Sequence, residues 1–230
     1  MIDIPEEKKK HFGFMGKSFT LLFYTQILIT VLSVFKSQYF AENFPLFCMI
    51  IRVAALITIV FYYEYLSLIK DQSIRYGNAC LFGLIAIVCD FIFAFLPLKN
   101  TFVILLASAV TLILTGLGEY NEYIGHAEYF AGVSDNLQNK WTNLCTVYLI
   151  TLITTVICSF LIILMPRFAA FCTVISLLVL VVVRILKMVY LHDSGAYLKN
   201  YGKPIQKSLN QNGWHIHLNC TIRYFMPYSL

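Results

Sequence analysis

Residues 168–186, which read FAAFCTVISLLVLVVVRIL, decide the fold class of this chain. The stretch holds 19 residues and a single charged side chain, that of Arg184. A helix that crosses the hydrocarbon core of a bilayer needs about 20 mainly apolar residues. The stretch is therefore predicted to be a membrane-spanning α-helix.

Five other stretches have the same character, and each ends at a charged residue, proline, glycine or asparagine. They are residues 17–35, 46–63, 78–97, 101–118 and 144–165. Together the six stretches predict an all-α polytopic membrane protein with six transmembrane helices. The transmembrane domain is expected to occupy residues 17–191, between an N-terminal segment of residues 1–16 and a polar tail of residues 192–230.

The composition of the whole chain agrees with this assignment. Of its 230 residues, 59% are hydrophobic and only 13% are charged, whereas an ordinary soluble domain is about 25% charged. This composition excludes a soluble enzyme, a secreted disulfide-bonded domain and a disordered protein. The seven cysteines lie in or beside the predicted spans or in the tail, so we expect packing roles and no disulfide framework.

The distribution of lysine and arginine predicts the orientation, because the cytoplasmic segments of membrane proteins are enriched in both. If the N-terminus is cytoplasmic, thirteen of the 17 Lys and Arg residues fall in cytoplasmic segments. Three fall in the outer turns, namely Lys36, Lys99 and Arg167. Both termini are therefore expected in the cytoplasm. Topology also explains the formal net charge of +5, so no nucleic-acid partner is needed.

Three short sequences suggest that the six helices form three tandem hairpins. Residues 62–66 read YYEYL, residues 120–124 read YNEYI and residues 187–191 read KMVYL, each near the end of the second helix of a hairpin. In the alternative interpretation, any two spans and a turn have this length, and tyrosines gather at membrane interfaces in any protein.

Arg52 and Asp90 are ionisable residues inside predicted spans, where a charged side chain usually faces the interior of the bundle. At a rise of 1.5 Å per residue, they lie about 9 and 10 Å below the outer ends of their helices. We predict a buried salt bridge between them. It would either clamp the two helices together or act as a gate or ion relay near the outer mouth.

Hydroxyl-bearing side chains follow one face of each of two predicted spans. Such faces allow helices to pack closely and to hydrogen-bond to each other, or they line a path for a polar solute. The residues are Ser108, Thr111 and Thr115 in the fourth span and Thr151, Thr155 and Ser159 in the fifth.

The segment after the fourth span carries a polar cluster of Glu119, Glu122, His126 and Glu128. If the helix continues through it, the first three share one face, and carboxylates and histidine are ligands for divalent metals. Because Gly125 weakens such a helix, we expect no metal site. The segment is instead predicted to lie along the inner membrane surface, with its carboxylates in water and its tyrosines near the lipid boundary.

Three classes of function follow from these features. A small transporter or channel for an ion or small solute is favoured by the six spans, the intramembrane charges and the hydroxyl faces. A membrane-embedded scaffold or subunit that binds a protein partner fits the polar segments on the cytoplasmic side. A membrane-embedded metal-dependent enzyme would have to use Glu119, Glu122 and His126.

We assign no catalytic residue and expect no cofactor. The expected partners are the lipid bilayer and either a second copy of the chain or another membrane protein.

Overall fold

The computed structural model describes residues 6–35, 43–95, 101–161 and 165–201. Within these ranges the chain forms six α-helices and one short 3-10 helix, and it contains no strand. The helices are α1 (Glu6–Val34), α3 (Pro45–Ser67), α4 (Ile74–Phe95), α5 (Thr101–Phe130), α6 (Asp135–Leu161) and α7 (Pro166–Asn200), with η1 (Lys70–Gln72) between α3 and α4.

Five of these helices, α1, α3, α4, α6 and α7, are long and apolar enough to cross a membrane. The prediction of an all-helical protein with membrane-spanning helices is confirmed to this extent. The helix α5 has 30 residues. It begins at Thr101, as predicted, but continues twelve residues past the predicted end of the span at Gly118.

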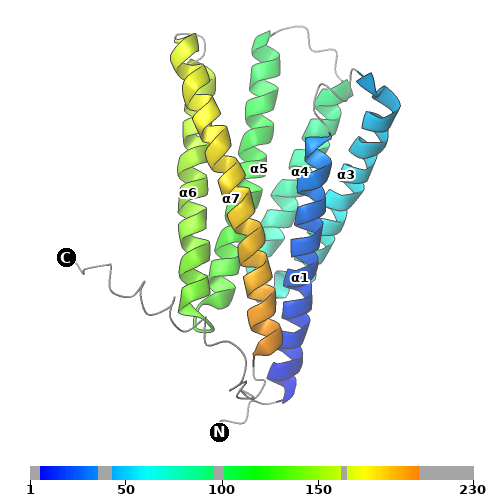
Figure 1. Cartoon of the computed structure of the whole chain (residues 1–230), viewed down its shortest axis with the longest axis vertical. Coiled ribbons are helices and arrows are strands. Elements are labelled where there is room, and N and C mark those ends of the chain that lie inside the picture. The colour runs from blue at the N-terminus through cyan, green and yellow to red at the C-terminus, as the bar shows by residue number, and fades with distance from the viewer. Residues whose placement is uncertain (1–5, 36–42, 96–100, 162–164, 202–230) are drawn as a thin grey trace, which may run out of the picture.

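Consecutive helices run in opposite directions and form a closed ring (Figure 1). Each helix packs against the helix before it and the helix after it, and α7 returns to pack against α1. The start of α1 and the end of α7 therefore lie together at the bottom of Figure 1, which we call the lower end. Toward the opposite, upper end, α1 and α7 diverge.

Glycines allow α1 and α7 to close the ring at the lower end. A Cβ atom added to Gly16 in α1 would lie 3.2 Å from the carbonyl oxygen of Gly195 in α7. A Cβ atom added to Gly195 would lie 2.8 Å from Oγ1 of Thr20. Small residues permit this close approach of two helix backbones, as they do at helix contacts within membranes.

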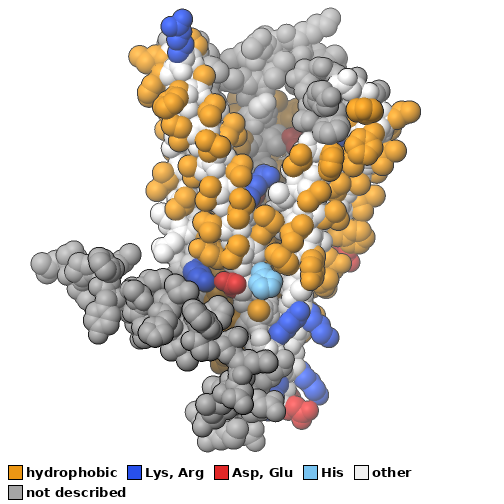
Figure 2. All heavy atoms as spheres, in the orientation of Figure 1, with side chains coloured by type: hydrophobic (Ala, Val, Ile, Leu, Met, Phe, Trp, Pro, Cys, Tyr) orange, Lys and Arg blue, Asp and Glu red, His pale blue; other side chains and the backbone are white. Residues whose placement is uncertain are grey.

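The outward faces of the helices are apolar over most of their length. Large hydrophobic side chains with more than a third of their surface exposed occur on all six helices. Figure 2 shows them covering much of the visible face, whereas charged side chains gather toward the lower end. This distribution fits a bundle surrounded by lipid.

Candidate functional site

The continuation of α5 beyond Gly118 brings two ionisable side chains into the interior of the bundle. The side chains of Glu122 and His126 lie one turn apart, and these residues are only 2% and 0% exposed. Gly125 does not end the helix, which continues to Phe130. A Cβ atom added to Gly125 would lie 2.9 Å from the Tyr76 ring in α4, so the glycine permits this ring to pack closely against α5.

The carboxylate of Glu122 lies beside polar groups from three positions. The Lys187 ammonium in α7 lies 2.9 Å from Oε2. The Tyr62 hydroxyl in α3 donates a hydrogen bond to Oε1. His126 Nε2 lies 3.4 Å from the same oxygen, although it makes no hydrogen bond within the described residues. Glu122 thus connects α5 with α3 and α7.

The imidazole of His126 contacts the three remaining helices. Its Nδ1 lies 2.9 Å from the Tyr76 hydroxyl in α4. The ring centroid lies 4.9 Å from that of Phe19 in α1 and 4.4 Å from that of Trp141 in α6. If Tyr76 donates to Nδ1, the imidazole proton is on Nε2 and points toward the Glu122 carboxylate.

All six helices therefore meet at one group of side chains, which we call the central cluster. It consists of Phe19, Tyr62, Tyr76, Glu122, His126, Trp141 and Lys187. Every member is nearly or completely buried. The cluster fills the ring in its lower half and joins α1, α3, α4, α5, α6 and α7 at one level.

The lysine of the central cluster is held by aromatic rings as well as by charge. Lys187 is 2% exposed, and its Nζ lies 5.2 Å from the ring centroid of Tyr62 and 5.3 Å from that of Tyr123. A cation within about 6 Å of an aromatic face is attracted by the negative face of the ring. The ammonium is thus stabilised by one carboxylate and two rings.

Electrostatics determine the protonation states of the two ionisable residues on α5. Burial raises the pKa of the Glu122 carboxyl, but Lys187, His126 and Tyr62 outweigh burial and lower the pKa to about 2. Burial also lowers the pKa of His126, against the opposing effect of Glu122. At neutral pH, Glu122 is therefore ionised and His126 neutral, so the charge pair is that of Glu122 and Lys187.

Two further polar contacts lie around the cluster. Trp141 Nε1 donates a 3.2 Å hydrogen bond to the buried hydroxyl of Ser194 in α7. Nearer the surface, Arg75 Nε lies 3.4 Å from Oε1 of Glu128, and these two side chains are 38% and 47% exposed. Solvent screens this outer pair, so it contributes much less than the buried one.

The structure corrects the prediction for the segment after Gly118. We expected a helix on the membrane surface with its carboxylates in water, yet Glu122 is buried in the bundle and Tyr123 is 0% exposed. Glu119 is half-buried and accepts a 3.3 Å hydrogen bond from the Tyr123 hydroxyl, and only Glu128 is exposed. The prediction was wrong because Lys187, from a distant part of the chain, neutralises the carboxylate.

The metal-dependent alternative would require Glu119, Glu122 and His126 to share one ion. Glu119 and Glu122 instead have different partners, Tyr123 and Lys187. In the part of the chain that the structure describes, no three His, Cys, Asp or Glu side chains are placed to hold a metal ion.

The predicted salt bridge between Arg52 and Asp90 is also wrong. Both side chains are exposed, and within residues 43–95 no ion pair joins them. The helices α3 and α4 approach closely farther down, where Cys80 Sγ contacts the carbonyl oxygen of Tyr63 at 3.4 Å. Equal depth along two neighbouring helices does not bring two side chains together, because the direction of each side chain around its helix also matters.

The predicted hydroxyl faces contribute mostly to their own helices. Thr151 and Thr155 are buried and donate 2.8 Å hydrogen bonds to backbone carbonyl oxygens four residues earlier in α6. Thr111 does the same in α5 at 3.2 Å. Ser108 is exposed and Thr115 is half-buried, while the side chain of Ser159 lies outside the described residues. The buried threonines therefore fit the packing interpretation.

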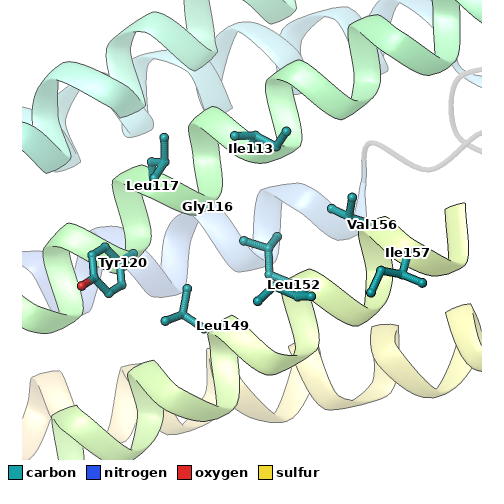
Figure 3. Close-up of a pocket in the computed structure, with 9 residues that line it drawn as sticks. Ile113, Gly116, Leu117, Tyr120, Leu149, Leu152, Val156 and Ile157 are labelled. Atoms are coloured by element: carbon teal, nitrogen blue, oxygen red, sulfur yellow. The ribbon is translucent and has the colours of Figure 1, made fainter. Parts of the chain in front are cut away.

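A separate groove lies between α5 and α6 (Figure 3). It has a volume of about 440 Å³. Leu152 packs over Gly116, where an added Cβ would lie 2.4 Å from Leu152 Cδ2. Apart from Tyr120 its lining is apolar, which suits a lipid chain better than a polar solute. The lining includes Ile113, Gly116, Leu117, Tyr120, Leu152 and Val156.

Sequence analysis missed several members of the central cluster, above all Lys187. Lys187 is one of the thirteen lysines and arginines that we counted in cytoplasmic segments. A periodicity signal was nevertheless present, because Lys187 falls on a helical face with Val183, Leu191 and Leu198, all of which are buried. A lysine within such an apolar stripe indicates a buried charge that needs a partner.

Comparisons with known proteins provide no assignment for this arrangement. No protein-family model matches the chain, and the searches of curated proteins and of solved structures find no significant similarity.

Proposed function

We propose that this chain is a six-span membrane protein that carries a small charged solute, and that the central cluster is its gate. The lower end, with both termini, would face the cytoplasm, as the lysine and arginine distribution predicts. Residues 1–16 and 192–230 would then be cytoplasmic. The fourth of these spans would be the apolar part of α5, residues 101–118, with the rest of this helix extending toward the cytoplasm.

The central cluster supports the tandem-hairpin interpretation of residues 17–191. The hairpins would be α1 with α3, α4 with α5, and α6 with α7. The first helix of each supplies an aromatic ring beside His126, and the second supplies a polar group at the Glu122 carboxylate. The rings are those of Phe19, Tyr76 and Trp141, and the polar groups those of Tyr62, Glu122 and Lys187.

The three polar residues that meet in the structure do not occupy the same position in the three short sequence repeats. Tyr62 and Lys187 are the first residues of their copies, whereas Glu122 is the third residue of residues 120–124. The three residues therefore lie at the same level of the bundle, although they are not at equivalent positions of the sequence repeats. We interpret the hairpins as equivalent in architecture, with each contributing a different chemical group to the gate.

The observation that carries the proposal is the buried ion pair of Glu122 and Lys187 at the level where all six helices meet. With the spans proposed above, Glu122 and Lys187 lie just past the cytoplasmic ends of residues 101–118 and 168–186. A buried ion pair adds little net stability compared with apolar packing, which favours a functional role for this one. The pair joins α5 to α7. A solute that enters from the upper end would therefore pass this level only if these helices separate.

Opening such a gate separates Glu122 from Lys187, so another charge must take the place of one of them. Separating Glu122 from Lys187 without compensation would leave two unpaired charges in a medium of low dielectric constant. A charged solute can replace one of them and thereby lower the cost of opening. The ion pair thus couples gate opening to the presence of a charged solute.

Charge movement across proteoliposomes tests this function. The purified protein is reconstituted and exposed to concentration jumps of sodium, potassium, choline and methylammonium chloride, and of potassium glutamate, while capacitive currents are recorded. We expect at least one salt to give a current several-fold above that of empty liposomes. Replacing both gate charges (Glu122→Gln with Lys187→Met) should change this current, whereas Glu128→Gln should not. Folded protein that gives no excess current with any of these salts would overturn the proposal.

A further inference from the structure

The immediate surroundings of the Lys187 ammonium resemble a binding site more than a simple salt bridge. One side is the Glu122 carboxylate, with Nζ and Oε2 2.9 Å apart. Two others are the ring faces of Tyr62 and Tyr123, at 5.2 and 5.3 Å from Nζ. A carboxylate combined with aromatic faces is a usual recognition chemistry for organic ammonium ions. The lysine side chain enters this enclosure from α7 like a tethered ligand.

We call the site formed by Glu122, Tyr62 and Tyr123 the enclosure. It would keep its shape if another ammonium ion replaced that of Lys187. Glu122 keeps its hydrogen bond from the Tyr62 hydroxyl and its proximity to His126 Nε2 at 3.4 Å, neither of which involves Lys187. The three walls come from α3 and α5 only. They therefore do not depend on α7, the helix that carries the lysine.

Glu119 is a second carboxylate beside the enclosure. Glu119 precedes Glu122 by three residues and so lies on the same face of α5, one turn toward the upper end. It is half-buried, and the hydroxyl of Tyr123, one of the walls of the enclosure, donates to it at 3.3 Å. If the long, flexible lysine side chain turned toward Glu119, this carboxylate would pair with its charge.

We propose that the enclosure of Glu122, Tyr62 and Tyr123 is a binding site for a small primary ammonium ion. Lys187 occupies the site when no ligand is present, and the incoming ion displaces the lysine toward Glu119. The assignment of this ion as the transported solute rests on the proposed function, but binding itself does not require transport.

A matched lysine elsewhere in the bundle provides a control. Lys140 in α6 also pairs with a carboxylate, that of Asp193 at 3.1 Å, and lies 5.4 Å from the ring centroid of Tyr190. Its side chain is 34% exposed, and the pair is accessible to solvent. Lys140→Ala therefore removes the same ammonium group as Lys187→Ala but leaves no buried cavity in which an ion could bind.

The first test removes the Lys187 side chain from the enclosure. Lys187→Ala is purified in detergent, and its thermal unfolding is followed with methylammonium chloride or with sodium chloride at equal ionic strength. We expect methylammonium to raise the Tm of Lys187→Ala by several degrees more than sodium does, and to leave Lys140→Ala unaffected. Adding Tyr123→Leu to Lys187→Ala should abolish the effect. A folded Lys187→Ala protein without response, or an equal response of Lys140→Ala, would overturn the inference.

The second test leaves the gate intact and remains decisive if Lys187→Ala does not fold. The chain has two tryptophans, and Trp214→Phe leaves Trp141, whose ring lies 6.1 Å from that of Tyr123, as the only one. Methylammonium chloride should change its fluorescence in a saturable way, whereas sodium chloride at equal ionic strength should not. No change specific to methylammonium would contradict the site.

The two proposals fail in different ways. Saturable methylammonium binding without any proteoliposome current would refute transport and retain the site. Currents with another salt, but no methylammonium binding, would refute the ammonium site and retain the gate.

Discussion

Glu122 in α5 and Lys187 in α7 are 65 residues apart in the sequence, yet they form a 2.9 Å salt bridge in which both side chains are only 3% exposed. The Tyr62 hydroxyl joins the same carboxylate from α3. One carboxylate thereby links the second helices of all three proposed hairpins. This relationship makes the ion pair both the main polar contact of the interior and the most informative place to perturb the protein.

Breaking the buried Glu122–Lys187 pair should lower the free energy of unfolding far more than breaking the exposed Glu128–Arg75 pair. We expect Glu122→Ala to lower the free energy of unfolding by about 3–5 kcal/mol, because an unpaired ammonium remains in a buried site. Glu128→Ala, which breaks the half-exposed pair with Arg75, should cost about 1 kcal/mol or less. Unfolding in mixed micelles measures both. Combining Glu122→Ala with Lys187→Met should recover part of the loss, and strict additivity would argue against the pairing.

Replacing each of two glycines in α1 by alanine should change the stability of the protein in opposite directions. At Gly16 the added Cβ would lie 3.0 Å from the backbone nitrogen of Lys199 and 3.2 Å from the Gly195 carbonyl oxygen. Gly16→Ala must therefore push α7 away, at a cost of about 1–3 kcal/mol. At Gly13 the Cβ meets no neighbouring atom within 4 Å among the described residues, so Gly13→Ala should gain up to about 1 kcal/mol of helix propensity. Equal changes in Tm for both variants would contradict the close crossing.

The hydrogen bond from Trp141 to Ser194 should appear as a coupling energy between α6 and α7. A double-mutant cycle of Trp141→Phe and Ser194→Ala is expected to give about 1 kcal/mol, the usual net value of such a bond. Thr142→Ala is a suitable control on α6, because the Thr142 hydroxyl is exposed and bonds only to the Gln138 carbonyl oxygen among the described contacts. This variant should change stability by less than about 0.5 kcal/mol.

The pH dependence of stability should report on His126. Burial lowers the pKa of His126 in the folded protein, so below pH 6.5 the unfolded chain binds a proton that the folded chain does not. Stability is therefore full above pH 6.5 and falls as the pH drops toward the folded pKa. Glu122, with a pKa of about 2, contributes to the pH dependence only below pH 4.5. His126→Gln should flatten this decline of stability below pH 6.5.

The proposed orientation can be tested by cysteine labelling in a variant without native cysteines. Arg167 at the upper end, and Asp71 and Asn136 at connections of the lower end, are all exposed. We expect Arg167→Cys to react with a membrane-impermeant maleimide in intact cells. Asp71→Cys and Asn136→Cys should react only after the membrane is opened. The reverse pattern would place the lower end outside.

The amino-acid sequence by itself determined the class of protein and the approximate extent of its helices. Hydrophobicity and length are properties of a local stretch, so the predicted span 46–63 lies within α3 (Pro45–Ser67) and the predicted start at 101 agrees with α5. The far end of α5 was missed, because Gly125 is unfavourable in an isolated helix. In the folded protein α5 continues to Phe130, and Gly125 packs against Tyr76 of α4.

Only the tertiary structure decided which charges are buried and which meet. The depth of a residue follows from a rise of 1.5 Å per residue, and depth alone suggested pairing Arg52 with Asp90. The direction in which a side chain points depends on how all the helices pack, and this exposes both of those residues. Glu122 could be buried because Lys187, 65 residues away, supplies the opposite charge. A local pattern cannot reveal such a partner, since the free energy of burying a charge depends on what surrounds it after folding.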